Sequence, residues 1–104
     1  MTLRLTAGEL AAERLGERAT LVQFSSAFCQ PCRATRRTLT EVAGMLEGVA
    51  HIEVDAEAQL DLVRRLEIQG TPTVMVLDAD GRVVRRAQGQ PRTADVIAAL
   101  GLVV

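Results

Sequence analysis

Segments whose apolar residues have the spacing of a strand alternate along the chain with segments whose apolar residues have the spacing of a helix. A mostly apolar run at 20–24 is typical of a strand that is buried on both faces. Four apolar residues within 39–46 recur at i, i+3, i+4 and i+7, which predicts a helix with one apolar face. At 49–54 apolar and polar residues alternate, so we expect another strand there.

The N-terminal residues carry a weaker form of the same pattern. The short run 3–5 predicts a first strand, and Thr6 with Glu9 matches the capping box that often starts a helix. We therefore expect a first helix over 7–15, which ends near Gly16.

The C-terminal half predicts one more helix, a hairpin and a final helix. Apolar residues mark a helix over 60–66, and strands at 73–77 and 82–87 flank a turn at 78–81. Thr93 is expected to cap the last helix. The order β-α-β-α-β-α-β-β-α indicates an α/β fold with a mostly parallel sheet, helices on both faces and an antiparallel edge.

Composition narrows the class of protein. The length of 104 residues fits one domain over 1–104, and 48% hydrophobic with 24% charged residues argues against disorder. Phe24 and Phe28 are the only aromatic residues, so the core is aliphatic and base-stacking platforms are nearly absent. The net charge of -1, with all 12 basic residues being Arg, argues against binding to nucleic acid or membrane surfaces.

The first ten residues predict no targeting segment. They contain no long apolar run and reach a charged residue, Glu9, early, so we expect neither a secretory signal nor a transmembrane segment. We therefore expect a cytoplasmic protein. Thiols are usually reduced in that compartment, and disulfides there tend to be transient and catalytic.

The two cysteines of the chain, Cys29 and Cys32, directly follow the buried strand predicted at 20–24. Cys29 is then expected at the N-terminus of the next helix, where the helix dipole and free N–H groups stabilise a thiolate, so it is the candidate nucleophile. Cys32, one turn further, is the candidate resolving thiol. Pro31 suits the first helical turn because its missing N–H has no helical partner.

Two other interpretations of the cysteine pair remain open. A structural zinc site usually needs four ligands, whereas this chain offers two cysteines and His51. Two inert thiols in a core are the second alternative. A redox pair is favoured because C-x-x-C beside a β-α-β pattern is typical of redox proteins, and we expect no metal and no cofactor.

The chain resembles the thioredoxin family over essentially its whole length. The segments that carry the resemblance are VQFSSAFCQPCR at 22–33, VDAE at 54–57, GTPTVMVLDADG at 70–81, and Gly89. The resemblance implies a thioredoxin fold, a three-layer α/β/α arrangement around a mixed five-stranded sheet. It also implies a thiol–disulfide oxidoreductase that reduces protein disulfides.

The resemblance assigns further roles. It implies a cis bond between Thr71 and Pro72, and a backbone at Thr71 that pairs with an extended client segment. Phe28 and Gly89 complete the implied substrate-binding residues. It also implies disulfide-containing client proteins, a thioredoxin reductase as electron donor, and a monomer.

The active-site motif differs from the family's usual W-C-G-P-C. Phe28 replaces the Trp, and Gln30 replaces the Gly between the cysteines, whereas Pro31 is retained. Residues at these positions tune the redox potential, and Pro31 resembles the reducing members. We expect a potential of about −270 to −200 mV. Arg33 either lowers a thiol pKa or is a solvated charge.

The buried Asp that typical thioredoxins place six residues before the first cysteine is Gln23 here. Gln cannot titrate, so proton transfer from Cys32 needs water or another group. His51 is a possible aid to this transfer, and its alternative is a polar strand residue. Gln23 itself is expected to hydrogen-bond inside the sheet, which avoids burial of a charge.

Other departures alter the expected helix and client surface. Arg37 replaces a helix-kinking proline, so we expect a straighter second helix. Thr71, Gln88 and Gln90 stand where the family usually has apolar residues, so we expect selective or weaker client binding. A redox-sensing or partner-specific binding module with little general reductase activity is therefore the alternative function.

Overall fold

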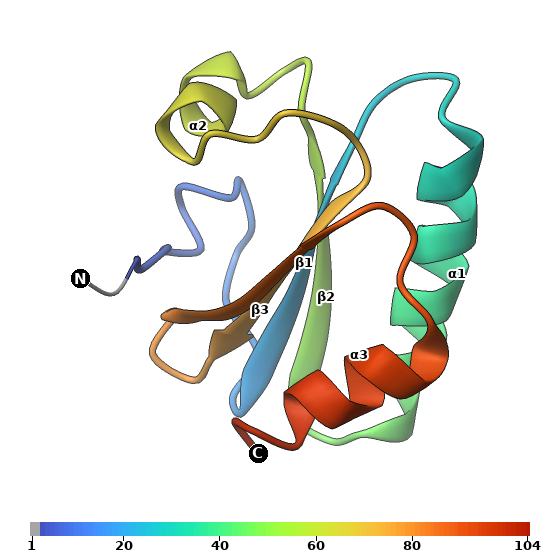
Figure 1. Cartoon of the computed structure of the whole chain (residues 1–104). Helices are drawn as coiled ribbons and strands as arrows, with labels where there is room; N and C mark the ends of the chain where they lie inside the picture. The colour runs from blue at the N-terminus through green and yellow to red at the C-terminus, as the bar shows by residue number, and fades with distance from the viewer. Residues whose placement is uncertain (1–2) are drawn as a thin grey trace.

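The computed structural model describes residues 3–104, whose elements follow the order β-α-β-α-β-β-α (Figure 1). None of the helices in this part of the chain is long and apolar enough to cross a membrane. The elements are β1 (Ala19–Ser25), α1 (Gln30–Met45), β2 (Val49–Asp55), α2 (Leu60–Arg65), β3 (Thr73–Asp78), β4 (Val83–Gln88) and α3 (Thr93–Leu100).

The sheet has the strand order β2-β1-β3-β4. β1 pairs in parallel with β2 and antiparallel with β3, and β3 and β4 form the antiparallel hairpin expected from the sequence. All seven residues of β1 are buried, as expected for a strand that is covered on both faces. The register places Gln23 of β1 beside Glu53 of β2.

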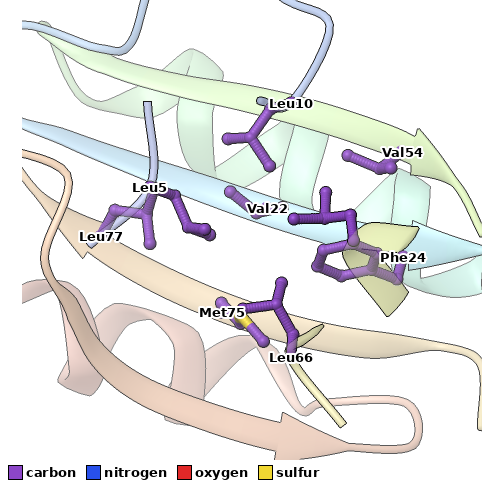
Figure 2. Packing of buried hydrophobic residues seen from close by; sticks show 9 residues of the cluster. Leu5, Leu10, Val22, Phe24, Val54, Leu66, Met75 and Leu77 are labelled. Atoms are coloured by element: carbon purple, nitrogen blue, oxygen red, sulfur yellow. The ribbon is translucent and has the colours of Figure 1, made fainter. Parts of the chain in front are cut away.

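Helices cover the two faces of the sheet unequally (Figure 1). α1 and α3 lie on one face, whereas the shorter α2 and the N-terminal segment lie on the other. Successive residues of β1 point to opposite faces, so Leu21 joins the α1 and α3 side and Val22 joins the α2 side. Figure 2 shows the hydrophobic cluster on the α2 side. Its buried members are Leu5, Leu10, Val22, Phe24, Val54, Leu62, Leu66, Met75 and Leu77.

The first helix and first strand expected from the sequence are wrong. The capping-box bonds do form, because the Glu9 N–H donates to Thr6 Oγ1 at 3.2 Å and the Thr6 N–H donates to Glu9 Oε1 at 2.9 Å. However, Ala11 adopts a left-handed φ of 55°, and the Ala12 N–H bonds to the Ala7 carbonyl at 2.9 Å. This closure is typical of a helix end, so the chain completes only a turn.

The first expected strand is reduced to a single bridge between Arg4 and Arg82, so the sheet has four strands instead of five. The mixed sheet implied by the resemblance is confirmed, but the mostly parallel sheet expected from the element order is wrong. Only β1 and β2 pair in parallel, whereas β3 runs antiparallel to both β1 and β4. The expected cap of the last helix is also wrong. The capping residue is Arg92, whose side chain makes no capping hydrogen bond to the helix backbone, and Thr93 is the first residue of α3.

Candidate active site at the start of α1

The two cysteines lie at the start of α1 and form a disulfide with a Cα–Cα distance of 5.2 Å. Cys29 is the residue that caps the helix, and its Sγ accepts a hydrogen bond from the Cys32 N–H at 3.2 Å. Cys29 is half-buried, whereas Cys32 is only 1% exposed. A reagent from solvent therefore reaches Cys29 first, and a helix N-terminus favours a thiolate there.

Phe28 stands immediately before the disulfide and is 98% exposed. Its φ of 57° lies in the left-handed region, which a bulky residue rarely adopts. Such conformations are sparsely populated, and the surrounding structure must hold them in place. The fold therefore presents a solvated aromatic ring beside Cys29 instead of packing it into the core.

The loop that contains Pro72 lies against the disulfide. The bond between Thr71 and Pro72 is cis, and the Thr71 carbonyl oxygen lies 3.9 Å from Cys29 Sγ. A side-chain hydrogen bond of 2.7 Å joins Thr71 Oγ1 to Ser26 Oγ, so this loop is also tied to the segment before α1. The Gly89 N–H donates to the Pro72 carbonyl at 2.8 Å. Thr71, Pro72 and Gly89 are thus gathered beside Cys29.

The surface beside this loop, formed by Gln88, Gly89 and Gln90, is open to solvent. Gly89 has a φ of 91°, and a Cβ added to it would meet no heavy atom within 4 Å. Gln88 lies over Gly70, because a Cβ on Gly70 would come within 2.7 Å of Gln88 Nε2. Gln88 and Gln90 are both exposed, so polar groups border the site on this side.

Gln23 lies on the inner side of the disulfide and is fully buried. Its Nε2 donates to the carbonyl of Cys32 at 2.7 Å and to Ser25 Oγ at 2.9 Å. Its Oε1 lies 3.2 Å from His51 Nε2. The buried amide is therefore fully hydrogen-bonded, as burial of an uncharged polar group requires.

Ser25 continues this hydrogen-bonded network to an ion pair. Its hydroxyl donates to Glu53 Oε2 at 2.8 Å, and the Arg36 guanidinium holds both oxygens of Glu53 at 2.7 and 2.9 Å. The Arg36 hydrogen bonds lower the pKa of Glu53, the Ser25 hydrogen bond adds to this, and burial opposes both. Ser25, Arg36 and Glu53 were not expected from the sequence as residues of the site.

His51 is half-buried at the other end of the network. Its Nδ1 lies 3.3 Å from Thr40 Oγ1. Burial lowers the pKa of His51, the Glu53 carboxylate opposes this, and the Arg36 guanidinium adds to it. The lowered pKa favours the uncharged form of the ring that faces Gln23.

The remaining residues named from the sequence surround the helix start. Gln30, Pro31 and Arg33 are exposed on α1, and the Arg33 N–H donates to the Cys29 carbonyl at 3.3 Å. Among residues 3–104, the Arg33 guanidinium has no carboxylate within ion-pair distance. Within the same range, no three His, Cys, Asp or Glu side chains are grouped in a way that would hold a metal ion.

Comparison with known sequences identifies the family. The family model named Thioredoxin matches residues 5–101. Thioredoxin of Mycolicibacterium smegmatis is 33% identical over 92 residues, which cover 85% of this chain and 81% of that protein. Protein disulfide isomerase-like 1-3 of Arabidopsis thaliana is 35% identical over 78 residues, 74% of this chain, but the match spans only 13% of that longer protein. The chain belongs to the thioredoxin family.

Solved structures agree on the fold. Chloroplastic thioredoxin z superimposes with a TM-score of 0.75 and 23% identity, over 98% of this chain and 96% of that one. Thioredoxin-2 of the malaria parasite gives a TM-score of 0.74 at 17% identity, over 82% of each chain. Two of the curated relatives are much longer than this chain, which spans 14% of human thioredoxin domain-containing protein 2 and 13% of the Arabidopsis protein.

Proposed function

We propose that this protein is a thiol–disulfide oxidoreductase that reduces disulfides in client proteins. The observation that carries the proposal is the position of the disulfide. Cys29 is accessible at the N-terminus of α1, Cys32 is buried behind it, and the loop with Pro72 lies against Cys29. Membership of the thioredoxin family supports the same class of activity.

The reaction starts from the reduced protein. The Cys29 thiolate attacks one sulfur of a client disulfide, and the other client sulfur leaves as a thiolate. Cys32 then loses its proton to solvent and attacks Cys29 Sγ, which releases the second client sulfur. Two electrons pass from the protein dithiol to the client, whose two thiolates take up protons from water, and the protein ends as the Cys29–Cys32 disulfide.

The client is proposed to bind along the rim formed by Phe28, Thr71 and Gly89. The Phe28 ring offers a solvated apolar contact, and the backbone around Thr71 offers hydrogen-bonding groups to an extended segment. We further propose that the protein acts in the cytoplasm as a monomer. From the resemblance to the thioredoxin family, we propose that a thioredoxin reductase returns it to the dithiol form.

Reduction of insulin, followed by turbidity, tests the proposal directly. The reduced protein should accelerate precipitation, and Cys29→Ser should abolish this acceleration because no nucleophile remains. Cys32→Ser should retain the first attack and accumulate covalent mixed disulfides with client proteins. Full activity of Cys29→Ser would overturn the mechanism.

A redox-sensing or partner-specific module is the second candidate. It is favoured by the polar rim, where Gln88 and Gln90 are exposed and the Thr71 hydroxyl is engaged with Ser26. Such a protein should reduce insulin slowly, fail to accept electrons from thioredoxin reductase, and yield one dominant partner when Cys32→Ser is used as a trap. Many trapped clients and rapid insulin reduction would favour the general reductase instead.

A further inference from the structure

The hydrogen bonds on the inner side of the disulfide have a defined direction. The Cys32 carbonyl oxygen only accepts, so the atom of Gln23 that faces it at 2.7 Å must be the nitrogen. The second N–H of this amide then donates to Ser25 Oγ at 2.9 Å. Ser25 has its own hydrogen to place, and it donates that hydrogen to Glu53 at 2.8 Å.

The same direction continues to His51. Both hydrogens of the Gln23 amide are used, and its oxygen remains to accept from His51 Nε2 at 3.2 Å. A neutral imidazole carries one N–H, so Nδ1 is left to accept from the Thr40 hydroxyl at 3.3 Å. The network therefore fixes one tautomer of His51, with the hydrogen on Nε2.

This network holds the start of α1 at two points. Gln23 of β1 binds the carbonyl of Cys32, and Glu53 of β2 binds the guanidinium of Arg36. Arg36 follows Cys32 by four residues, which is about one helical turn. Ser25 connects the two points, so the turn that carries Cys32 is attached to both strands by one continuous set of bonds.

We propose that Ser25 and Glu53 are positioning residues for the resolving cysteine. Glu53 accepts a hydrogen bond from the Ser25 hydroxyl, and Ser25 in turn orients the Gln23 amide. Gln23 then holds the helical turn so that Cys32 points at the mixed disulfide on Cys29. This inference rests on the proposed dithiol mechanism and adds residues that neither touch the client nor react. It assigns the network to the second chemical step alone.

The two chemical steps are separable with Ellman's reagent, an aromatic disulfide whose released thiolate is yellow. Attack by Cys29 on the reagent releases one thiolate and leaves the other half bound to Cys29. Attack by Cys32 on Cys29 then releases the second thiolate and forms the protein disulfide. Stopped-flow absorbance of the reduced full-length protein therefore gives one rate constant for each cysteine.

Ser25→Ala should slow the second release about tenfold, the effect of losing about one hydrogen bond, and leave the first release unchanged. Ser25→Thr should keep the wild-type rates because its hydroxyl remains. Ser25 borders a hollow of about 350 Å³, which is also lined by Arg36 and Glu53, so its surroundings are not closed on every side.

Glu53→Ala should likewise slow the second release, whereas Glu53→Gln should keep most of the rate because its amide oxygen still accepts from Ser25. Glu41→Ala is the matched control, since Glu41 is exposed on α1 and forms no ion pair among the described residues. Second-release rates of Ser25→Ala and Glu53→Ala within twofold of wild type would overturn the proposal, as would equal slowing of both releases.

A measurement on the unmodified protein guards against variants that fail to fold. Nitrogen chemical shifts of the His51 ring at neutral pH should report the hydrogen on Nε2, and a ring with its hydrogen on Nδ1 would overturn the assigned direction of the network. The proposed function fails separately. If wild-type protein releases no second thiolate at all, the dithiol mechanism itself is wrong, whatever the state of His51.

Discussion

The two sides of the Cys29–Cys32 disulfide are built from different chemical groups. The outer side consists of the exposed ring of Phe28, the carbonyl of Thr71 and the open glycine at 89. The inner side consists of buried or half-buried polar side chains that are linked by hydrogen bonds, with Gln23 at the centre. In the proposed mechanism, the outer side governs client binding, and the inner side governs stability and the geometry of Cys32.

Replacing Gln23 with Leu should produce the largest effect. The substitution leaves the hydroxyl of Ser25 and the ring of His51 without their buried partner, so we expect a loss of about 2 to 4 kcal/mol in the free energy of unfolding. Urea denaturation at neutral pH measures it. Gln90→Leu is the matched control on the exposed rim, where the same change should cost less than about 0.5 kcal/mol. Equal losses in the two variants would contradict the comparison.

Acidification should lower the free energy of unfolding, because His51 becomes protonated. Burial lowers its pKa in the folded state, so the unfolded chain binds a proton more readily. Stability should therefore be complete above the unfolded value of about 6.5 and should fall as the pH drops below it. Urea midpoints at pH values on either side of that value test this in the wild type and in His51→Asn. A wild-type midpoint that does not decrease on acidification would contradict the direction of the shift.

Replacing Phe28 with Ala should give the smallest change in stability. The side chain is 98% exposed, so the free energy of unfolding should change by less than about 0.5 kcal/mol. Client reduction should nevertheless fall about three- to tenfold, through a higher KM for insulin, because an apolar anchor is lost. Reaction with the small Ellman's reagent should stay near wild type and serves as the control. Unchanged insulin kinetics would show that Phe28 does not contribute to client binding.

Periodicity and spacing were enough to predict the regular core of this protein. The apolar runs correctly predicted β1, the helix of α1, the hairpin of β3 and β4, and the relation of both cysteines to the start of α1. These features depend on local residue order, which the sequence displays directly. The loop with Pro72 was expected only because the chain resembles a known family.

Features that depend on tertiary packing were not predictable in the same way. The capping box near the N-terminus forms its bonds, but the left-handed backbone of Ala11 ends the turn before a helix develops. Ser25 and Glu53 are 28 residues apart and meet because of the register between β1 and β2. Hydrophobic periodicity carries no information about such a pair. The contact between Ser25 and Glu53 follows only from the register of the two strands, so the sequence did not predict it.

The edge strand β4 has a further consequence for behaviour at high concentration. Unpaired strand edges can recruit other chains and start aggregation, and proteins commonly block them with charged residues or a covering segment. Here the Val83 N–H donates to the Leu3 carbonyl at 2.8 Å, so the N-terminal segment occupies the first part of that edge. Arg85 and Arg86 are exposed further along the strand and add like charges. The N-terminal segment, which forms only a single bridge, therefore leaves less of the β4 edge free for intermolecular strand pairing.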